Sequence, residues 1–321
     1  MPRRRAIPGR SCPPHYGYAP AVFVRPADLR TRSLFIVGGL YGNPFALETV
    51  LSLARRENAT LVFNGDFNWF NVDADGFSAL NESVLRHAAL RGNVETEIAG
   101  EEGGSGCGCA YPEWVGDAEV DRSNRILERL RVTARGFPDL RARLGALPMH
   151  LVAEIGGLRV GIAHGDAESL AGWQFSQEAL RERPERARAL LAAADIDLFA
   201  CTHTCLPVMQ EFVTPRGTAL VVNNGAAGMP NFRDTHFGLA TRIALEPSGE
   251  ALYGTRLGAV VVEAVPVRYD PGAWLARFDR LWPEGSPASL SYRKRIASGP
   301  EYELDQALRL STPSGALTRA A

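Results

Sequence analysis

The chain opens with two short apolar runs, each followed by polar and glycine residues and then by a stretch with helical periodicity. The runs cover residues 34–37 and residues 61–63, and the second ends in Asn64-Gly65-Asp66. Short apolar runs bounded by turn residues predict buried strands. Residues 44–56 and 74–90 carry apolar positions at helical spacing. The order strand, helix, strand, helix therefore predicts a layered α/β fold.

The rest of the chain continues this α/β pattern. An arginine-rich helical block is expected at residues 117–135 and 138–144. Apolar runs then predict strands at residues 151–154, 158–163, 196–200, 209–212, 219–222, 239–245 and 260–265. Further helices are expected at residues 177–193, 270–281 and 301–310.

The pattern also predicts how the chain is divided. Residues 1–30 contain arginines and prolines without an apolar signal segment, so we expect a frayed N-terminal arm. Residues 31–285 form the predicted main domain, with a Gly/Cys loop and a helical insert at about 97–146. Residues 286–321 are expected to be a C-terminal extension.

Charge and cysteine content exclude several classes of protein. The 35 Lys and Arg residues nearly balance the 36 Asp and Glu residues, so no broad nucleic-acid or anionic membrane surface is expected. No apolar run reaches the roughly 18 residues of a membrane span. Five cysteines in a chain of this size do not predict a disulfide framework, which favours a cytoplasmic location. The sequence leaves open whether the chain forms a homo-oligomer.

Polar side chains concentrate at the ends of the predicted strands, where ligands bind in open α/β sheets. The residues best suited to hold a metal ion are Asp66, Asn93, His164 and His203. Two imidazoles, a carboxylate and an amide oxygen suit Mn, Fe or Zn. A bound ion of this kind lowers the pKa of its water toward ~7 and polarises a phosphoryl oxygen.

The order of these motifs resembles that of the calcineurin-like metallophosphoesterases over roughly residues 34–231. The pattern of that family is Asp-x-His, Gly-Asp, Gly-Asn-His-Asp/Glu, a lone His and Gly-His-x-His. The chain matches it at Gly65-Asp66, Gly92-Asn93, His164 and His203. The resemblance implies a four-layer αββα sandwich, with two mixed β-sheets flanked by helices. It also implies hydrolysis of a small phosphomonoester or phosphodiester.

The departures from the family pattern fall almost entirely on one of its two metal sites. Gly39 and Tyr41 stand where the first Asp and His are expected, and Cys205 stands where the last His is expected. Of that site only the shared Asp66 remains, whereas the second site is complete. The proton-handling His falls on Val94, and a general acid contributes about 10²–10⁴ in rate. We therefore expect an altered phosphoesterase with one divalent ion per chain, whose metal ligands are also its catalytic residues.

Several further residues are candidates for the site. We expect Asn43, Asn68, Asn224 and the Tyr41 hydroxyl to contact the phosphate, although Asn43 also suits the cap of the helix that starts at Pro44. Tyr41 alternatively fills the space of the lost metal. The tryptophans at positions 69, 114 and 173 are expected in the core, with stacking on a nucleobase as the alternative.

The cysteines leave a third hypothesis open. Cys107 and Cys109 lie in the glycine-rich loop, and Cys205 stands at a ligand position, so three thiolates could form a soft metal site or a redox centre. Each is otherwise a small buried or loop residue. The alternatives to a hydrolase are thus a catalytically inactive binding protein with the same fold and a thiolate-assisted metal-binding protein.

Overall fold

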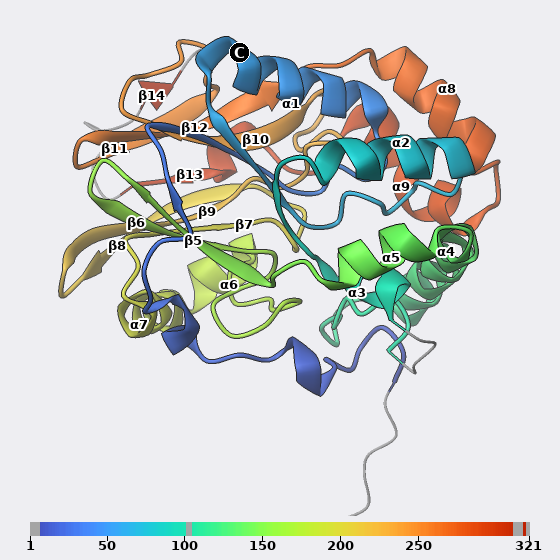
Figure 1. Ribbon diagram of the computed structural model, residues 1–321, viewed down its shortest axis with the longest axis horizontal. Helices are drawn as coiled ribbons and strands as arrows, with labels where there is room; N and C mark the ends of the chain where they lie inside the picture. The colour runs from blue at the N-terminus through green and yellow to red at the C-terminus, as the bar shows by residue number, and fades with distance from the viewer. Residues whose placement is uncertain (1–6, 101–104, 311–316, 319–321) are drawn as a thin grey trace, which may run out of the picture.

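The computed structural model describes residues 7–100, 105–310 and 317–318, which form two seven-stranded mixed β-sheets packed face to face between layers of helices (Figure 1). This arrangement confirms the predicted αββα sandwich. In the described part of the chain, no helix has both the length and the apolar character needed to cross a membrane.

The first sheet contains the two strands that open the sequence pattern. Its order is β14 (Leu317–Thr318), β11 (Tyr253–Leu257), β12 (Val260–Val267), β10 (Gly238–Ala244), β2 (Ser33–Val37), β3 (Thr60–Asn64) and β4 (Ala88–Leu90). The last three strands run parallel to one another. The outer face of this sheet is covered by α1 (Pro44–Glu57), α2 (Ala74–Val84) and α8 (Pro271–Leu281).

The second sheet supplies the two histidines of the predicted metal site. Its order is β1 (Leu29–Arg30), β5 (His150–Ile155), β6 (Leu158–Ala163), β7 (Leu198–Cys201), β9 (Gly217–Asn223), β8 (Val208–Thr214) and β13 (Leu308–Arg309). Strands β6 and β7 run parallel, so both end at the same edge of the sheet. The outer face is covered by α6 (Gln177–Glu182) and α7 (Pro184–Ala194).

Alternation along each strand fills the spaces between the layers. In β2, Phe35 and Val37 pack against the outer helices, whereas Leu34 and Ile36 pack between the two sheets. Neighbouring side chains of a strand point to opposite faces, so a strand with helices on one side and a sheet on the other is apolar throughout. This explains why the sequence pattern showed short continuous apolar runs.

Two predicted helices prove shorter than expected. The helix predicted at 74–90 ends at Val84, and the rest of that range contains β4, which is mostly buried and pairs in parallel with β3. The helix predicted at 177–193 is broken at Pro184, which begins α7. Proline has no backbone N–H to donate inside a helix, so it occurs in the first turn instead.

The C-terminal part differs most from the prediction. The helix expected at 301–310 is wrong, because this segment forms a short 3₁₀ turn at Leu304–Gln306 and then β13. Instead, an unpredicted helix, α9 (Pro287–Ser298), packs against α8 and against α4 (Asp117–Arg135). It buries few side chains. Tertiary contacts rather than a strong apolar stripe therefore stabilise this helix.

The predicted arm and insert both pack onto the sandwich. In the described part of the arm, Tyr16 and Phe23 are fully buried and β1 joins the second sheet, so the expectation of a frayed segment is wrong for residues 7–30. The predicted insert contains α3 (Asn93–Ala99), α4 and α5 (Pro138–Gly145), which pack on one another. Its glycine-rich loop lies partly outside the described residues.

Candidate metal centre

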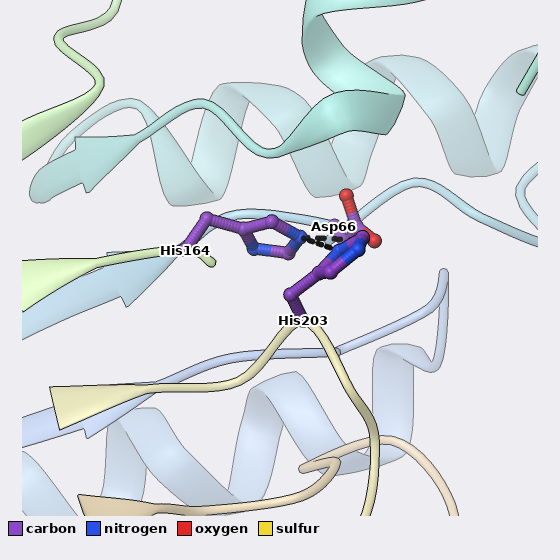
Figure 2. A group of neighbouring side chains, drawn as sticks. All are labelled: Asp66, His164 and His203. Carbon is purple, nitrogen blue, oxygen red and sulfur yellow. Dashed lines mark hydrogen bonds and ion pairs between the residues drawn. The ribbon is translucent and has the colours of Figure 1, made fainter. Parts of the chain in front are cut away.

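Four buried side chains from four separate segments meet around one nitrogen atom. His164 Nε2 lies 3.1 Å from His203 Nδ1, 3.2 Å from Asn93 Oδ1 and 3.3 Å from Asp66 Oδ2. Asp66 follows β3, Asn93 begins α3, and the two histidines follow β6 and β7. Figure 2 shows both imidazoles pointing toward the Asp66 carboxylate. The structure therefore brings together the four predicted residues, which we call the DNHH cluster.

Backbone carbonyls determine which atoms of the cluster face its centre. His164 Nδ1 lies 2.9 Å from the Asn64 carbonyl, and His203 Nε2 lies 3.0 Å from the Cys109 carbonyl. A carbonyl oxygen only accepts, so these nitrogens carry hydrogen, and the opposite nitrogens face the centre. A carbonyl partner on the outer nitrogen is also the usual arrangement of histidines that bind metal.

The amide of Asn93 is oriented in the same way. Its Nδ2 donates to the Cys107 carbonyl at 3.0 Å, which directs Oδ1 toward His164. With neutral imidazoles, all four atoms that meet are hydrogen-bond acceptors. Such a group is stable only with a proton or a cation among the acceptors. The donor set therefore fits a divalent metal ion.

The electrostatics of the cluster point to the same requirement. Burial, together with nearby His164, lowers the pKa of His203 to about 4. Burial also acts to lower the pKa of His164, but the charge and hydrogen bond of Asp66 outweigh this effect and raise it. For Asp66, burial acts to raise the pKa, yet the His164 charge outweighs it and the pKa is lowered. The surroundings thus favour positive charge beside the Asp66 carboxylate.

A buried glutamate that the sequence pattern had not singled out holds two of the ligand segments in place. Glu95 accepts hydrogen bonds from the backbone N–H groups of Asp66 (2.7 Å), Phe67 (3.1 Å) and Gly92 (3.1 Å). It also accepts one from Asn68 Nδ2 at 3.2 Å. Burial and the nearby Asp66 charge raise the pKa of Glu95 to about 7. Glu95 stands three residues after Gly92, which is the spacing of a capping box, and this spacing is the sequence signal that could have identified it.

Tyr41 contacts both of the other residues that replace family ligands in the resemblance, Gly39 and Cys205. The Tyr41 hydroxyl lies 2.8 Å from Cys205 Sγ. A Cβ atom added to Gly39 would lie only 2.9 Å from Tyr41 Cζ. The Tyr41 ring therefore occupies the space beside residue 39, as the space-filling alternative predicted.

The structure does not place Cys205 with the other predicted ligands. Its thiol forms a hydrogen bond with the Tyr41 hydroxyl. Among the described residues, the Asp, Glu, His and Cys side chains close enough to share an ion are Asp66, His164 and His203. The prediction of Cys205 as a metal ligand is therefore not supported, and neither is a site built from three thiolates.

Cys107 and Cys109 contact the cluster mainly through their backbone. Their carbonyls accept hydrogen bonds from Asn93 and His203, whereas the Cys109 thiol only accepts a longer hydrogen bond of 3.6 Å from Asn93 Nδ2. Serine retains these carbonyls. We therefore expect a Cys107→Ser, Cys109→Ser protein to bind as much Mn²⁺ per folded chain as the parent, measured by elemental analysis. A loss of half the bound metal or more would contradict this expectation and show that the thiols take part in metal binding.

The three asparagines predicted to contact phosphate have structural roles instead. Asn43 caps α1 through its Oδ1 and donates to the Gly228 carbonyl. Asn68 exchanges hydrogen bonds with Asn81. Asn224 donates to two backbone carbonyls. None of the three lines the pocket described next, because their amides satisfy buried groups within the fold.

A pocket of about 400 Å³ opens over the cluster. Asp66, Asn93 and His203 form part of its lining. Its walls are rich in aromatic side chains, namely Tyr41, Trp69, Tyr111, Trp114, Trp173 and Tyr292. The prediction of a core position is wrong for Trp114, which is 68% exposed and lies edge-on to Trp173 at 5.7 Å. The site therefore combines a polar floor with aromatic walls.

Two solved structures share this fold over most of both chains. Hypothetical protein PH1004 from Pyrococcus horikoshii OT3 has a TM-score of 0.57 at 16% sequence identity, over 84% of this chain and 99% of that chain. A metallophosphoesterase from Sphaerobacter thermophilus has a TM-score of 0.54 at 20% identity, again over 84% and 99%. No protein-family model and no curated protein matches the sequence. The chain has the metallophosphoesterase fold, and the resemblance seen in its motifs is confirmed at that level.

Proposed function

We propose that the protein is a metal-dependent phosphoesterase that uses one divalent ion per chain. The observation that carries this proposal is the DNHH cluster, in which three ligand atoms lie within 3.3 Å of His164 Nε2. The metallophosphoesterase fold supports it, because that fold places the cluster at the ends of β3, β6 and β7, where ligands bind. Mn, Fe and Zn all suit the two imidazoles with a carboxylate and an amide oxygen.

Each residue of the site has a defined task in this proposal. When bound, the ion would supply Lewis-acid charge to a phosphoryl oxygen and acidify a water molecule. Asp66 contributes the negative charge that holds the ion, and the two histidines contribute neutral donors oriented by backbone carbonyls. The aromatic walls of the pocket exclude water and contact the organic part of the ester.

Turnover of simple esters tests this function. Bis(p-nitrophenyl) phosphate and p-nitrophenyl phosphate, each assayed with Mn²⁺, Zn²⁺ or Fe²⁺ and with a chelator, separate diesterase from monoesterase activity. We expect release of p-nitrophenol that depends on the metal and is lost with the chelator. A protein that binds the ion but hydrolyses neither ester with any of the three metals would contradict the proposal.

One observation favours a second candidate, an inactive binding protein with the same fold. Val94 stands where the family has its proton-handling histidine, and this side chain is fully buried. A valine neither donates nor accepts a proton, so the position contributes no general acid. In that case the pocket would bind a phosphorylated ligand without converting it. Calorimetric binding of phosphate to a metal-loaded protein without turnover would favour this candidate.

The exposed rim of the pocket leads to a specific prediction. Trp114 offers an accessible aromatic face, and stacking on such a face contributes about 1–3 kcal/mol in related settings. We expect Trp114→Ala to raise KM for the aryl diester about 5- to 10-fold while kcat changes little, because the contact is present before and during reaction. Trp114→Phe should keep most of the affinity. Leu290→Ala, at another exposed apolar side chain, is the matched control, and an equal rise in KM there would contradict the prediction.

A further inference from the structure

One arginine lines the pocket beside Tyr41 and Cys205. Arg295 lies on α9, and its Nη2 donates to the Cys205 carbonyl at 2.6 Å. Its positive charge acts on the Tyr41 hydroxyl and the Cys205 thiol, against the larger effect of burial, which raises the pKa of both groups. Arg295 therefore lies at the side of the pocket where Tyr41 and Cys205 meet.

Backbone and amide oxygens hold the Arg295 guanidinium, and no carboxylate of the described residues pairs with it. Nε donates to the Pro230 carbonyl at 3.1 Å, and Nη2 also approaches Asn231 Oδ1 at 3.5 Å. Within the described residues, Nη1 has no hydrogen-bond partner and Arg295 forms no ion pair. Its neighbours on α9 differ, because Arg293 and Lys294 both pair with carboxylates.

The charges around the pocket make this arginine unusual. Its lining includes three carboxylates, Asp66, Glu119 and Glu178, of which Glu119 already pairs with Arg122. Among the residues that the structure describes, Arg295 is the only lysine or arginine in the lining. An anion that enters the pocket therefore meets fixed positive charge on one side only, apart from an ion in the DNHH cluster.

We propose that Arg295 forms an anion subsite that binds a phosphoryl oxygen of the substrate in the pocket that it shares with the DNHH cluster. This inference rests on the proposed function, since it divides the phosphate between the cluster and the guanidinium. A guanidinium suits the task because its planar fork matches the spacing of phosphate oxygens and keeps its charge at all physiological pH values. The acceptors that hold Nε and Nη2 orient the fork in advance, which lowers the entropic cost of binding.

Binding of inorganic phosphate tests the subsite without relying on turnover. Parent, Arg295→Met and Arg295→Lys proteins are loaded with Mn²⁺, freed of excess metal and titrated with phosphate in a calorimeter. We expect Arg295→Met to weaken phosphate binding about 10- to 100-fold, the effect of losing a charged hydrogen bond, with unchanged metal content. Arg295→Lys should lose less phosphate affinity, because lysine keeps the positive charge but lacks the planar pair of N–H donors.

Arg141→Met is the matched control. The Nε and Nη2 atoms of Arg141 also donate to backbone carbonyls, and it too has no carboxylate partner among the residues that the structure describes, but it lies outside the pocket lining. Equal losses of phosphate affinity in Arg295→Met and Arg141→Met, or no loss in either Arg295 variant, would overturn the subsite. If Arg295→Met does not fold, the difference in phosphate affinity between the parent and Arg295→Lys tests the subsite.

The same titrations separate the subsite from the function on which it rests. Phosphate binding that depends on Arg295, in a protein that hydrolyses no ester, would support the proposed subsite and contradict the proposed phosphoesterase activity. If the parent and Arg295→Met hydrolyse the ester with the same KM and bind phosphate with the same affinity, the phosphoesterase proposal is supported and the subsite proposal is contradicted.

Discussion

Replacing His203 with alanine is expected to remove the bound metal and with it the turnover of phosphate esters. His203 Nδ1 is one of the three atoms that approach His164 Nε2, and its orientation is set by the Cys109 carbonyl. Alanine removes a neutral nitrogen donor that no nearby side chain can replace, since the described Asp, Glu, His and Cys side chains that gather here are already in the cluster. We expect no Mn²⁺ after dialysis and at least about a thousandfold lower kcat/KM, or roughly 4 kcal/mol in activation free energy.

Two measurements make this result interpretable. Elemental analysis reports the metal directly, so loss of activity through a damaged pocket is distinguished from loss of the ion. His236→Ala, at an exposed histidine, controls for the general effect of losing an imidazole. An unchanged metal content or unchanged hydrolysis in His203→Ala would reject the cluster as the metal centre.

Glu95→Ala is expected to destabilise the fold and the metal site together. The substitution leaves three buried backbone N–H groups without their acceptor, in the segments that carry Asp66 and Asn93. Each unsatisfied group costs about 1–3 kcal/mol, so we expect the free energy of unfolding to fall by roughly 3 kcal/mol or more. Metal affinity should fall about 10- to 100-fold, the usual effect of removing a group that orients ligands.

Urea unfolding and metal titration of the same variant test both parts. Glu95→Gln keeps the volume and one acceptor oxygen, so it should lie between Glu95→Ala and the parent in both measurements. Glu128→Ala is the matched control, because Glu128 is exposed on α4. A Glu95→Ala protein as stable as the Glu128→Ala protein would show that Glu95 does not hold the two segments.

The four cluster residues could be predicted because each lies in a short polar turn after an apolar run or at the start of a helix. Asp66 follows a strand of the first sheet and the two histidines follow parallel strands of the second, and the packed sheets bring these strand ends together. Asn43 and Asn224 belong to similar turns, but their amides bind backbone groups, and the sequence does not show which turn amides are used in this way. Glu95 was not singled out because its spacing from Gly92 indicates a helix cap and does not show that the acid also binds the N–H groups of Asp66 and Phe67.

Arg295 could not be predicted for a different reason. Its helix, α9, has few apolar positions and is stabilised by packing on α4 and α8, which are distant in the sequence. Periodicity shows helices that carry an apolar stripe, and it does not show where a weakly amphipathic segment docks. The residues from 286 onward were therefore expected to be an extension, although they supply one wall of the pocket.

The contact between Gly39 and Tyr41 also bears on how this chain could change in evolution. A lone Gly39→Asp substitution would bring its Cβ to within 2.9 Å of the tyrosine ring, on a backbone whose φ of +62° already disfavours side chains. A lone change of Tyr41 to a smaller residue would leave a void beside Cys205 and still provide no carboxylate. Either substitution alone is therefore expected to lower stability without completing a second set of metal ligands. Residues 39 and 41 constrain each other, so a change that is tolerated at one position depends on a change at the other.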